Sequence, residues 1–263
     1  MYLEISRHNS MVRWRINRPE RFNALGVTMG HLLSEALTEL EEKIKARPDE
    51  YRALVIEAAP QQKKGQQRIW IAGGDMKELA QLDFKEGEAY SRQWHSICVG
   101  LQELPIPVVV LIDGLAIGGG AELALSADIR IGNETTGLWF LQMDVGLATG
   151  YGGATRLTAL VGTSLASYWL LSGKKLSATE AKEAGLLHEL YRDSGDMELW
   201  IHNFEKRIDK LGYESVAAQK AMLAGAVHYS TEKARKKELK LFAKLWGNKW
   251  HKQALEKYLD SSH

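Results

Sequence analysis

Three consecutive glycines followed by a glutamate are the residues whose types and spacing best suit chemistry. The glycines at 118–120 come after residues 108–112, an apolar and β-branched run that predicts a buried strand, and before residues 121–125, which predict a helix. The first N–H groups of a helix have no partner within it, and they lie at the positive end of its dipole. Because glycine brings bare backbone close to a ligand, this turn suits an anion or a developing oxyanion, with the Glu122 carboxyl beside it.

A second glycine turn has the same arrangement. Residues 70–79 run from a strand end through Gly73 and Gly74 into a helix, with Asp75 where an N-cap belongs. Two such turns in one fold can aim two N–H groups at a single oxygen, which is the requirement for an oxyanion hole. Either turn taken separately is more often a plain tight turn than a catalytic one.

The elements that must position these turns alternate between strands and helices, which predicts an α/β fold. Strands are expected at residues 12–16, 53–56, 69–72, 108–112 and 128–131, and long helices at residues 29–44 and 87–104. After about residue 190 the strand patterns end, and helices are expected at residues 197–211, 214–226, 231–246 and 249–259. We therefore expect an α/β core over residues 1–195 and an all-helical region over residues 196–263.

Composition limits the classes of partner. The 263 residues carry a formal charge of +1, so the chain lacks the basic excess that nucleic acid or an anionic membrane usually selects. No apolar signal region and no uncharged apolar run of about 18 residues is present, which predicts a cytoplasmic protein that does not enter membranes. Cys98 is the single cysteine, and we expect a buried structural thiol and no metal site.

Several stretches in this order and spacing resemble the crotonase (enoyl-CoA hydratase/isomerase) superfamily. They are residues 17–25, 72–75, 114–128, 152–157 and 171–186. The resemblance implies a spiral of ββα units with a C-terminal helical trimerisation region, assembled as a homotrimer or as a homohexamer of two trimers. It also implies an acyl-coenzyme A thioester as substrate, with no separate cofactor.

The same resemblance implies roles for particular residues. The N–H groups of Gly74 and Gly119 would bind the thioester oxygen, and Glu122 would be one of two hydratase glutamates and act as acid or base. The path of coenzyme A would be lined by Glu20, Arg21, Phe22, Ala72, Asp75, Met76, Lys77 and Gly118.

The chain departs from the family pattern where the second hydratase glutamate belongs. That position holds Gln142, whose amide has no dissociable proton at working pH, although it can hold a water molecule. Asp144 follows two residues later. If residues 141–145 are extended, positions 142 and 144 share a face and Asp144 can reach the pocket; otherwise Asp144 lies at the surface, which is the more frequent situation.

Several reactions stay open for such a site. The nominal prediction is an enoyl-CoA hydratase-like lyase. One acid and an oxyanion hole also suffice to decarboxylate a malonyl-type thioester such as methylmalonyl- or ethylmalonyl-CoA. A double-bond isomerase and a non-catalytic acyl-CoA-binding protein are further alternatives.

Other residues favour plainer interpretations. His95 lies on a predicted helix, where a structural role is more frequent than a catalytic one. Lys240 and Lys244 belong to a predicted solvated helix face, with contact to a coenzyme A phosphate across a subunit boundary as the alternative. Bulky Trp246 and Trp250 suggest a shortened acyl tunnel, hence a small or medium acyl group.

Overall fold

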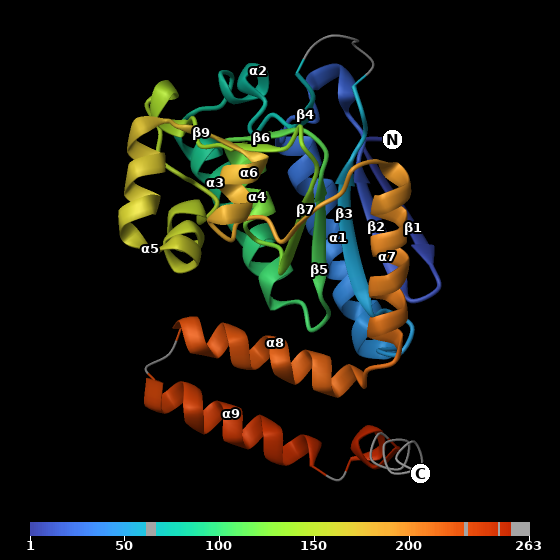
Figure 1. The fold of residues 1–263 in the computed structure, drawn as a ribbon. Helices are drawn as coiled ribbons and strands as arrows, with labels where there is room; N and C mark the ends of the chain where they lie inside the picture. Colours follow the sequence, from blue (N-terminus) through green and yellow to red (C-terminus); the bar gives the residue numbers. More distant parts are fainter. Residues whose placement is uncertain (62–66, 229–230, 247, 254–263) are drawn as a thin grey trace.

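The computed structural model describes residues 1–61, 67–228, 231–246 and 248–253, which form two β-sheets and the helices around them (Figure 1). The larger sheet has six strands in the order β1 (Leu3–His8), β2 (Met11–Ile16), β3 (Ala53–Ala58), β5 (Val108–Ile112), β7 (Ile129–Gly132) and β10 (Glu189–Leu190). Strands β1 and β2 are antiparallel, and the other neighbours are parallel. All five residues of β5 are buried, as expected for a central strand covered on both faces.

Strands of the smaller sheet lead directly into the two glycine turns. Its four strands have the order β4 (Ile69–Ile71), β6 (Leu115–Ile117), β8 (Gly137–Trp139) and β9 (Lys175–Ser177). Three strands of the larger sheet are each followed in the chain by a strand of the smaller sheet: β3 by β4, β5 by β6, and β7 by β8. Helices follow after β4 and β6, so the chain winds in the ββα spiral that the resemblance implies.

Helices surround the sheets within the described residues. Their bounds are α1 (Val27–Ala46), α2 (Met76–Leu79), α3 (Phe84–Glu103), α4 (Gly119–Ala124), α5 (Gly153–Ser172), α6 (Ala178–Glu183), α7 (Ser194–Asp209), α8 (Tyr213–His228) and α9 (Thr231–Leu245), with 3-10 turns η1 (Pro19–Arg21) and η2 (Gln142–Val145). Helix α1 buries Met29, Leu33 and Leu37 at the three- and four-residue spacing read from the sequence. Helix α3 begins with an Asp83–Glu86 capping box.

The predicted strands and long helices are confirmed to within a few residues, whereas several short strands were not predicted. These are β6, β8, β9 and β10; the six-residue strand β1 and the 20-residue helix α5 were not predicted either. The predicted helix at 249–259 is helical through residue 253, and its remainder lies outside the described residues.

The helices after residue 193 do not all occupy the same place. Helix α7 packs Met197, Ile201 and Phe204 against the larger sheet. Helices α8 and α9 instead lie side by side beyond one end of the strands of the larger sheet (Figure 1). Lys220 joins α8 to the core, because its Nζ lies 2.6 Å from Asp128 Oδ2 and 2.8 Å from the Ile106 carbonyl oxygen. The division at residue 195 stays a prediction.

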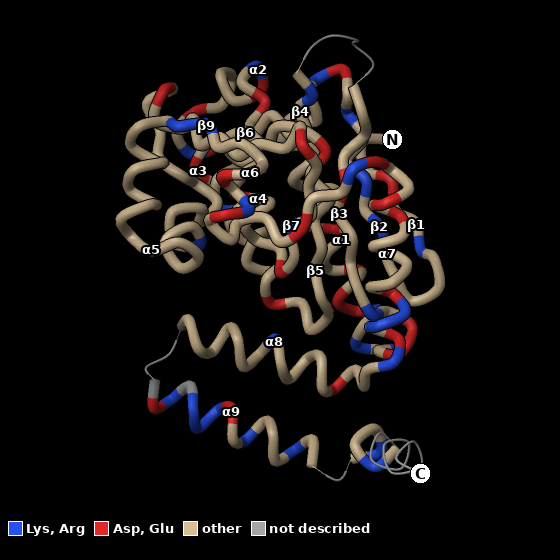
Figure 2. Tube along the Cα trace, in the orientation of Figure 1, with Lys and Arg blue, Asp and Glu red and all other residues tan. Residues whose placement is uncertain are grey.

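Charge is mixed over the core, while Lys and Arg are concentrated along α9 (Figure 2). Lys240 and Lys244 are exposed there, as predicted for a solvated face. No helix among the described residues is long and apolar enough to cross a membrane.

Candidate active site

The two glycine turns meet because β4 and β6, the strands that lead into them, are parallel neighbours. Gly73 has φ +82°, and a Cβ built on it would lie 2.7 Å from the Ile117 carbonyl oxygen and 3.0 Å from the Gly119 nitrogen. A side chain at position 73 would therefore force the turns apart. The predicted proximity of the turns is confirmed.

Both N–H groups assigned to the oxyanion are free of protein acceptors within the described residues. Leu25 forms an isolated bridge to Gly74 in which Leu25 N donates to the Gly73 carbonyl (2.6 Å) and Asp75 N donates to the Leu25 carbonyl (3.4 Å). The Gly74 N–H takes part in neither of these two hydrogen bonds. Gly119 is the first residue of α4, so its N–H has no carbonyl in the helix to bind.

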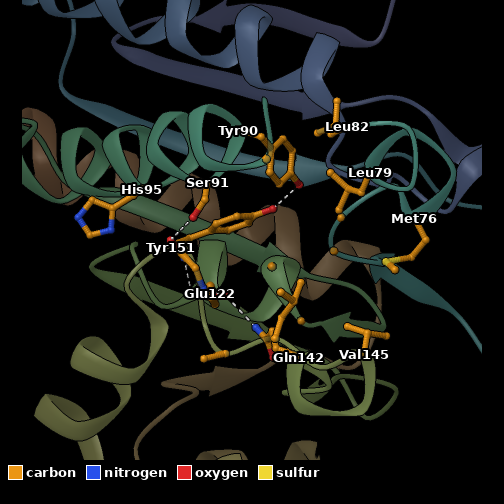
Figure 3. Close-up of a pocket in the computed structure, with 18 of the residues that line it drawn as sticks. Met76, Leu79, Leu82, Tyr90, Ser91, His95, Glu122, Gln142, Val145 and Tyr151 are labelled. Carbon is orange, nitrogen blue, oxygen red and sulfur yellow. Dashed lines mark hydrogen bonds between the residues drawn. The ribbon is translucent and has the colours of Figure 1, made fainter. Parts of the chain in front are cut away.

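Gly74 and Gly119 line a cavity of about 830 Å³ (Figure 3). Much of its wall is apolar and comes from Met76, Leu79, Leu82, Phe84, Val145 and Leu147. Helix α3 adds polar side chains, namely Glu88, Ser91, Arg92 and His95. An acyl chain could occupy the apolar part while its carbonyl faces the turns.

Glu122 lies in α4 beside Gln142 (Figure 3); the residue is 1% exposed, and its carboxylate accepts four hydrogen bonds. Oε1 accepts from Gln142 Nε2 (2.7 Å) and Gly150 N (3.2 Å), and Oε2 accepts from Tyr151 N and Gly153 N (2.8 Å each). Burial raises the pKa of Glu122, and the four donors oppose that rise. Since a carboxylate offers about four lone-pair positions, it has to release a donor before it can bind a water molecule.

Gln142 is one of the residues that line the cavity. Its Nε2 is engaged with Glu122, while its Oε1 is buried and has no donor within the described residues. Residues 142–145 form η2, a 3-10 turn, so the extended conformation that would bring Asp144 into the pocket is absent there. Asp144 is exposed and is not among the residues that line the cavity.

The two segments predicted to border coenzyme A lie together, because Ala72 N donates to the Phe22 carbonyl at 3.0 Å. Ala72, Met76 and Gly118 line the cavity, while Glu20, Arg21, Phe22 and Lys77 lie outside its lining. Asp75 also lies outside it. The Asp75 carboxylate is buried, caps α2, and pairs with Arg18 Nη2 at 3.0 Å, which gives it a structural role in the Gly74 turn.

The remaining candidates lie apart from the turns. His95 is exposed at the cavity wall on α3. Trp246 is 68% exposed at the end of α9, and Trp250 packs against Gly212, so neither lines the cavity of its own chain. Among the described residues, no cluster of three His, Cys, Asp or Glu side chains could hold a metal ion.

Sequence reasoning missed two residues of the site, Tyr90 and Tyr151. Both are buried, line the cavity, and hydrogen-bond to each other through their hydroxyl groups (Figure 3). The available signal was an aromatic residue within a third glycine-rich turn, at Gly150–Gly153.

Comparison with protein families matches residues 6–263 to enoyl-CoA hydratase/isomerase. Among curated proteins, mouse (Mus musculus) enoyl-CoA hydratase domain-containing protein 2, mitochondrial, is 32% identical over 66% of this chain and 55% of that protein. Mouse methylglutaconyl-CoA hydratase, mitochondrial, is 33% identical over 65% and 51%. The aligned segment thus spans about half the length of these relatives.

Solved structures agree in fold. Enoyl-CoA hydratase from Bacillus anthracis has a TM-score of 0.90 at 24% identity, covering 99% of this chain and 97% of that chain. Enoyl-CoA hydratase from Thermoplasma volcanium has a TM-score of 0.85 at 29% identity, covering 98% and 97%.

Proposed function

The chain belongs to the enoyl-CoA hydratase/isomerase family, and we propose that it processes acyl-CoA thioesters through an enolate held in the oxyanion site. One observation carries the proposal. The N–H groups of Gly74 and Gly119 belong to touching turns, lack protein acceptors within the described residues, and border an apolar cavity.

The chemistry follows from where charge develops. Enolate formation moves negative charge onto the thioester oxygen, and fixed N–H donors aimed at that oxygen lower the barrier by about 3–4 kcal/mol each. The donors are held by β-strand ends and a helix start, so they need little reorganisation during the reaction.

In a hydratase-like reaction, Glu122 is the group that takes or gives the proton, and Gln142 orients the water. Three donors to Glu122 are fixed main-chain groups, whereas the fourth is the Gln142 side chain. A water molecule could replace the Gln142 amide on Glu122 Oε1 and donate its other hydrogen to Gln142 Oε1. Asp144 has no role in this proposal because it is exposed outside the cavity.

Decarboxylation of a malonyl-type thioester is a second candidate, favoured by the four hydrogen bonds that occupy the Glu122 carboxylate. Loss of carbon dioxide needs no base to break the C–C bond, only stabilisation of the enolate and a later proton.

Product masses distinguish these reactions. The purified protein is incubated with crotonyl-CoA, methylmalonyl-CoA and ethylmalonyl-CoA, and each product is weighed by mass spectrometry. Gain of water by crotonyl-CoA supports the hydratase-like reaction, and loss of carbon dioxide supports the second candidate. Tight coenzyme A binding without turnover of any acyl-CoA, including saturated and β,γ-unsaturated ones, would instead identify a non-catalytic binding protein.

We further propose a homotrimer or a dimer of trimers, with α8 and α9 meeting other copies of the chain. The support is a set of apolar side chains that are 52–70% exposed on and just after these helices, namely Leu223, Val227, Leu239, Phe242 and Trp246. A cytoplasmic location and the absence of a separate cofactor stay predictions; the mouse relatives above are named as mitochondrial.

A further inference from the structure

Two buried tyrosines from distant parts of the chain pack beside the two glycine turns, Tyr90 beside Gly74 and Tyr151 beside Gly119. We propose that the hydrogen-bonded hydroxyl groups of Tyr90 and Tyr151, here called the tyrosine pair, set the separation of the Gly74 and Gly119 N–H groups. The inference rests on the proposed function, because the separation matters only if one oxygen binds both groups. The tyrosines are positioning residues in this proposal.

Tyr90 holds the first turn. Its hydroxyl donates to the Leu25 carbonyl at 2.6 Å, and Leu25 N in turn donates to the Gly73 carbonyl at 2.6 Å. The Tyr90 oxygen would also lie 3.3 Å from a Cβ built on Gly74. A shift of Tyr90 would therefore be passed to the Gly74 turn through Leu25.

Tyr151 holds the second turn and the carboxylate. A Cβ built on Gly119 would lie 2.4 Å from Tyr151 Cε2 and 3.1 Å from its hydroxyl oxygen, so the ring packs directly on this glycine. The Tyr151 N–H donates to Glu122 Oε2 at 2.8 Å. One residue thus contacts an oxyanion donor and fixes the acid.

The hydrogen bond between the two hydroxyl groups links the contacts of Tyr90 with the first turn to those of Tyr151 with the second. Tyr90 uses its proton on Leu25, so Tyr151 is the donor in the bond between them. Burial raises the pKa of both phenols, which keeps both protons in place. Trp94 stacks on Tyr151 with ring centroids 5.4 Å apart, which limits rotation of the ring.

Tyr151→Phe is the decisive variant. It removes the hydroxyl bond but keeps the ring on Gly119 and the N–H on Glu122, so the protein should fold. We expect kcat to fall about 10- to 100-fold, because small displacements of positioning groups cost about that much, while the Kd of free coenzyme A stays within twofold. Tyr90→Phe should have a similar effect, and the double variant should be no worse than the more impaired single one, because the pair acts as a unit.

Tyr191→Phe is the matched control. Tyr191 is also a buried tyrosine whose hydroxyl accepts a hydrogen bond, from Asn133 Nδ2 at 3.3 Å, but it lies outside the cavity. The kcat of Tyr191→Phe should equal that of the wild type. Unchanged kcat in Tyr151→Phe, or a loss of kcat accompanied by an equal loss of coenzyme A affinity, would overturn the proposal.

A binding experiment separates this proposal from the proposed function. Butyryl-CoA and S-butyl-CoA, a thioether without the carbonyl, are titrated into wild type and Tyr151→Phe. We expect the wild type to bind butyryl-CoA more tightly than S-butyl-CoA. In Tyr151→Phe, the logarithm of the ratio of these two Kd values should fall to half of its wild-type value or less. A ratio preserved in the variant overturns the role of the tyrosine pair alone. No preference in the wild type overturns the oxyanion site, and the tyrosine pair with it.

Discussion

At the scale of single residues, the main finding is that hydrogen bonds fix the Glu122 carboxylate in place. Its two oxygens accept four hydrogen bonds, three of them from the main chain between residues 150 and 153. The position of Glu122 beside the glycine turn was predictable, since it follows the glycines closely in the sequence. Its anchoring was not, because the donors lie 20 to 31 residues further along the chain.

Glu122→Gln tests both roles of this side chain. The new amide would point its NH₂ group at two N–H donors, and each buried donor left without an acceptor costs about 1–3 kcal/mol. We expect loss of turnover, near-normal coenzyme A binding, and a fall of about 2–6 kcal/mol in the free energy of unfolding measured with urea. Glu180→Gln, on the exposed α6 capping box, is the control and should keep full activity. Retained turnover in Glu122→Gln would reject the acid–base role.

Cys98 gives a second prediction at this scale. The thiol is fully buried among apolar residues, as expected from the sequence, and this burial raises its pKa to about 12. We expect no reaction with a thiol reagent such as DTNB at pH 8 in the native protein, and one reactive thiol per chain after unfolding in urea. Fast labelling of the native protein would contradict this burial.

At the scale of elements, the long helices with a clear apolar period were predictable, whereas the shortest strands, the six-residue strand β1 and the 20-residue helix α5, which Gly162 interrupts, were not. Helices α1 and α3 have apolar residues at helical spacing over 20 residues each. Strands β6, β8 and β9 have only three residues each, which is too short for a period to show. The 3-10 conformation of η2 could not be predicted from the sequence either. Because of this conformation, Gln142 lines the cavity and Asp144 does not.

The N-caps of α2 and α3 provide a matched test at this scale. Asp75 is buried, caps α2, and pairs with Arg18, whereas Asp83 is exposed and caps α3. Asp75→Ala should lower the free energy of unfolding by about 3 kcal/mol, since it also leaves a buried arginine with one partner fewer, and should lower kcat through the adjoining Gly74. Asp83→Ala should cost about 1 kcal/mol and leave kcat unchanged. Equal losses in both variants would mean that the Asp75–Arg18 pair adds nothing to the cap.

At the scale of the molecule, α8 and α9 stand apart from the core that holds the site. The sequence predicted these two helices, but their pairing beyond the strand ends depends on packing between distant segments, which the sequence pattern does not show. Their exposed apolar residues lead to the last prediction.

Leu239→Glu places a charge on a side chain that is 70% exposed on α9. If copies of the chain meet there, the variant should have a smaller mass in light scattering than the wild type, since an unpaired charge in an interface is costly. Leu199→Glu, on an equally apolar and 57% exposed position of α7, should keep the wild-type mass. A wild-type monomer would refute the proposed assembly.

The anchoring of Glu122 by main-chain groups has an evolutionary consequence. Every amino acid except proline carries a backbone N–H, so substitutions at positions 150 and 151 can preserve the anchor, while position 153 must stay glycine because a Cβ there would lie 2.5 Å from Glu122 Cγ. Descendants of this sequence could therefore exchange residue 142, and so acquire a different reaction, while the three main-chain hydrogen bonds to Glu122 are kept.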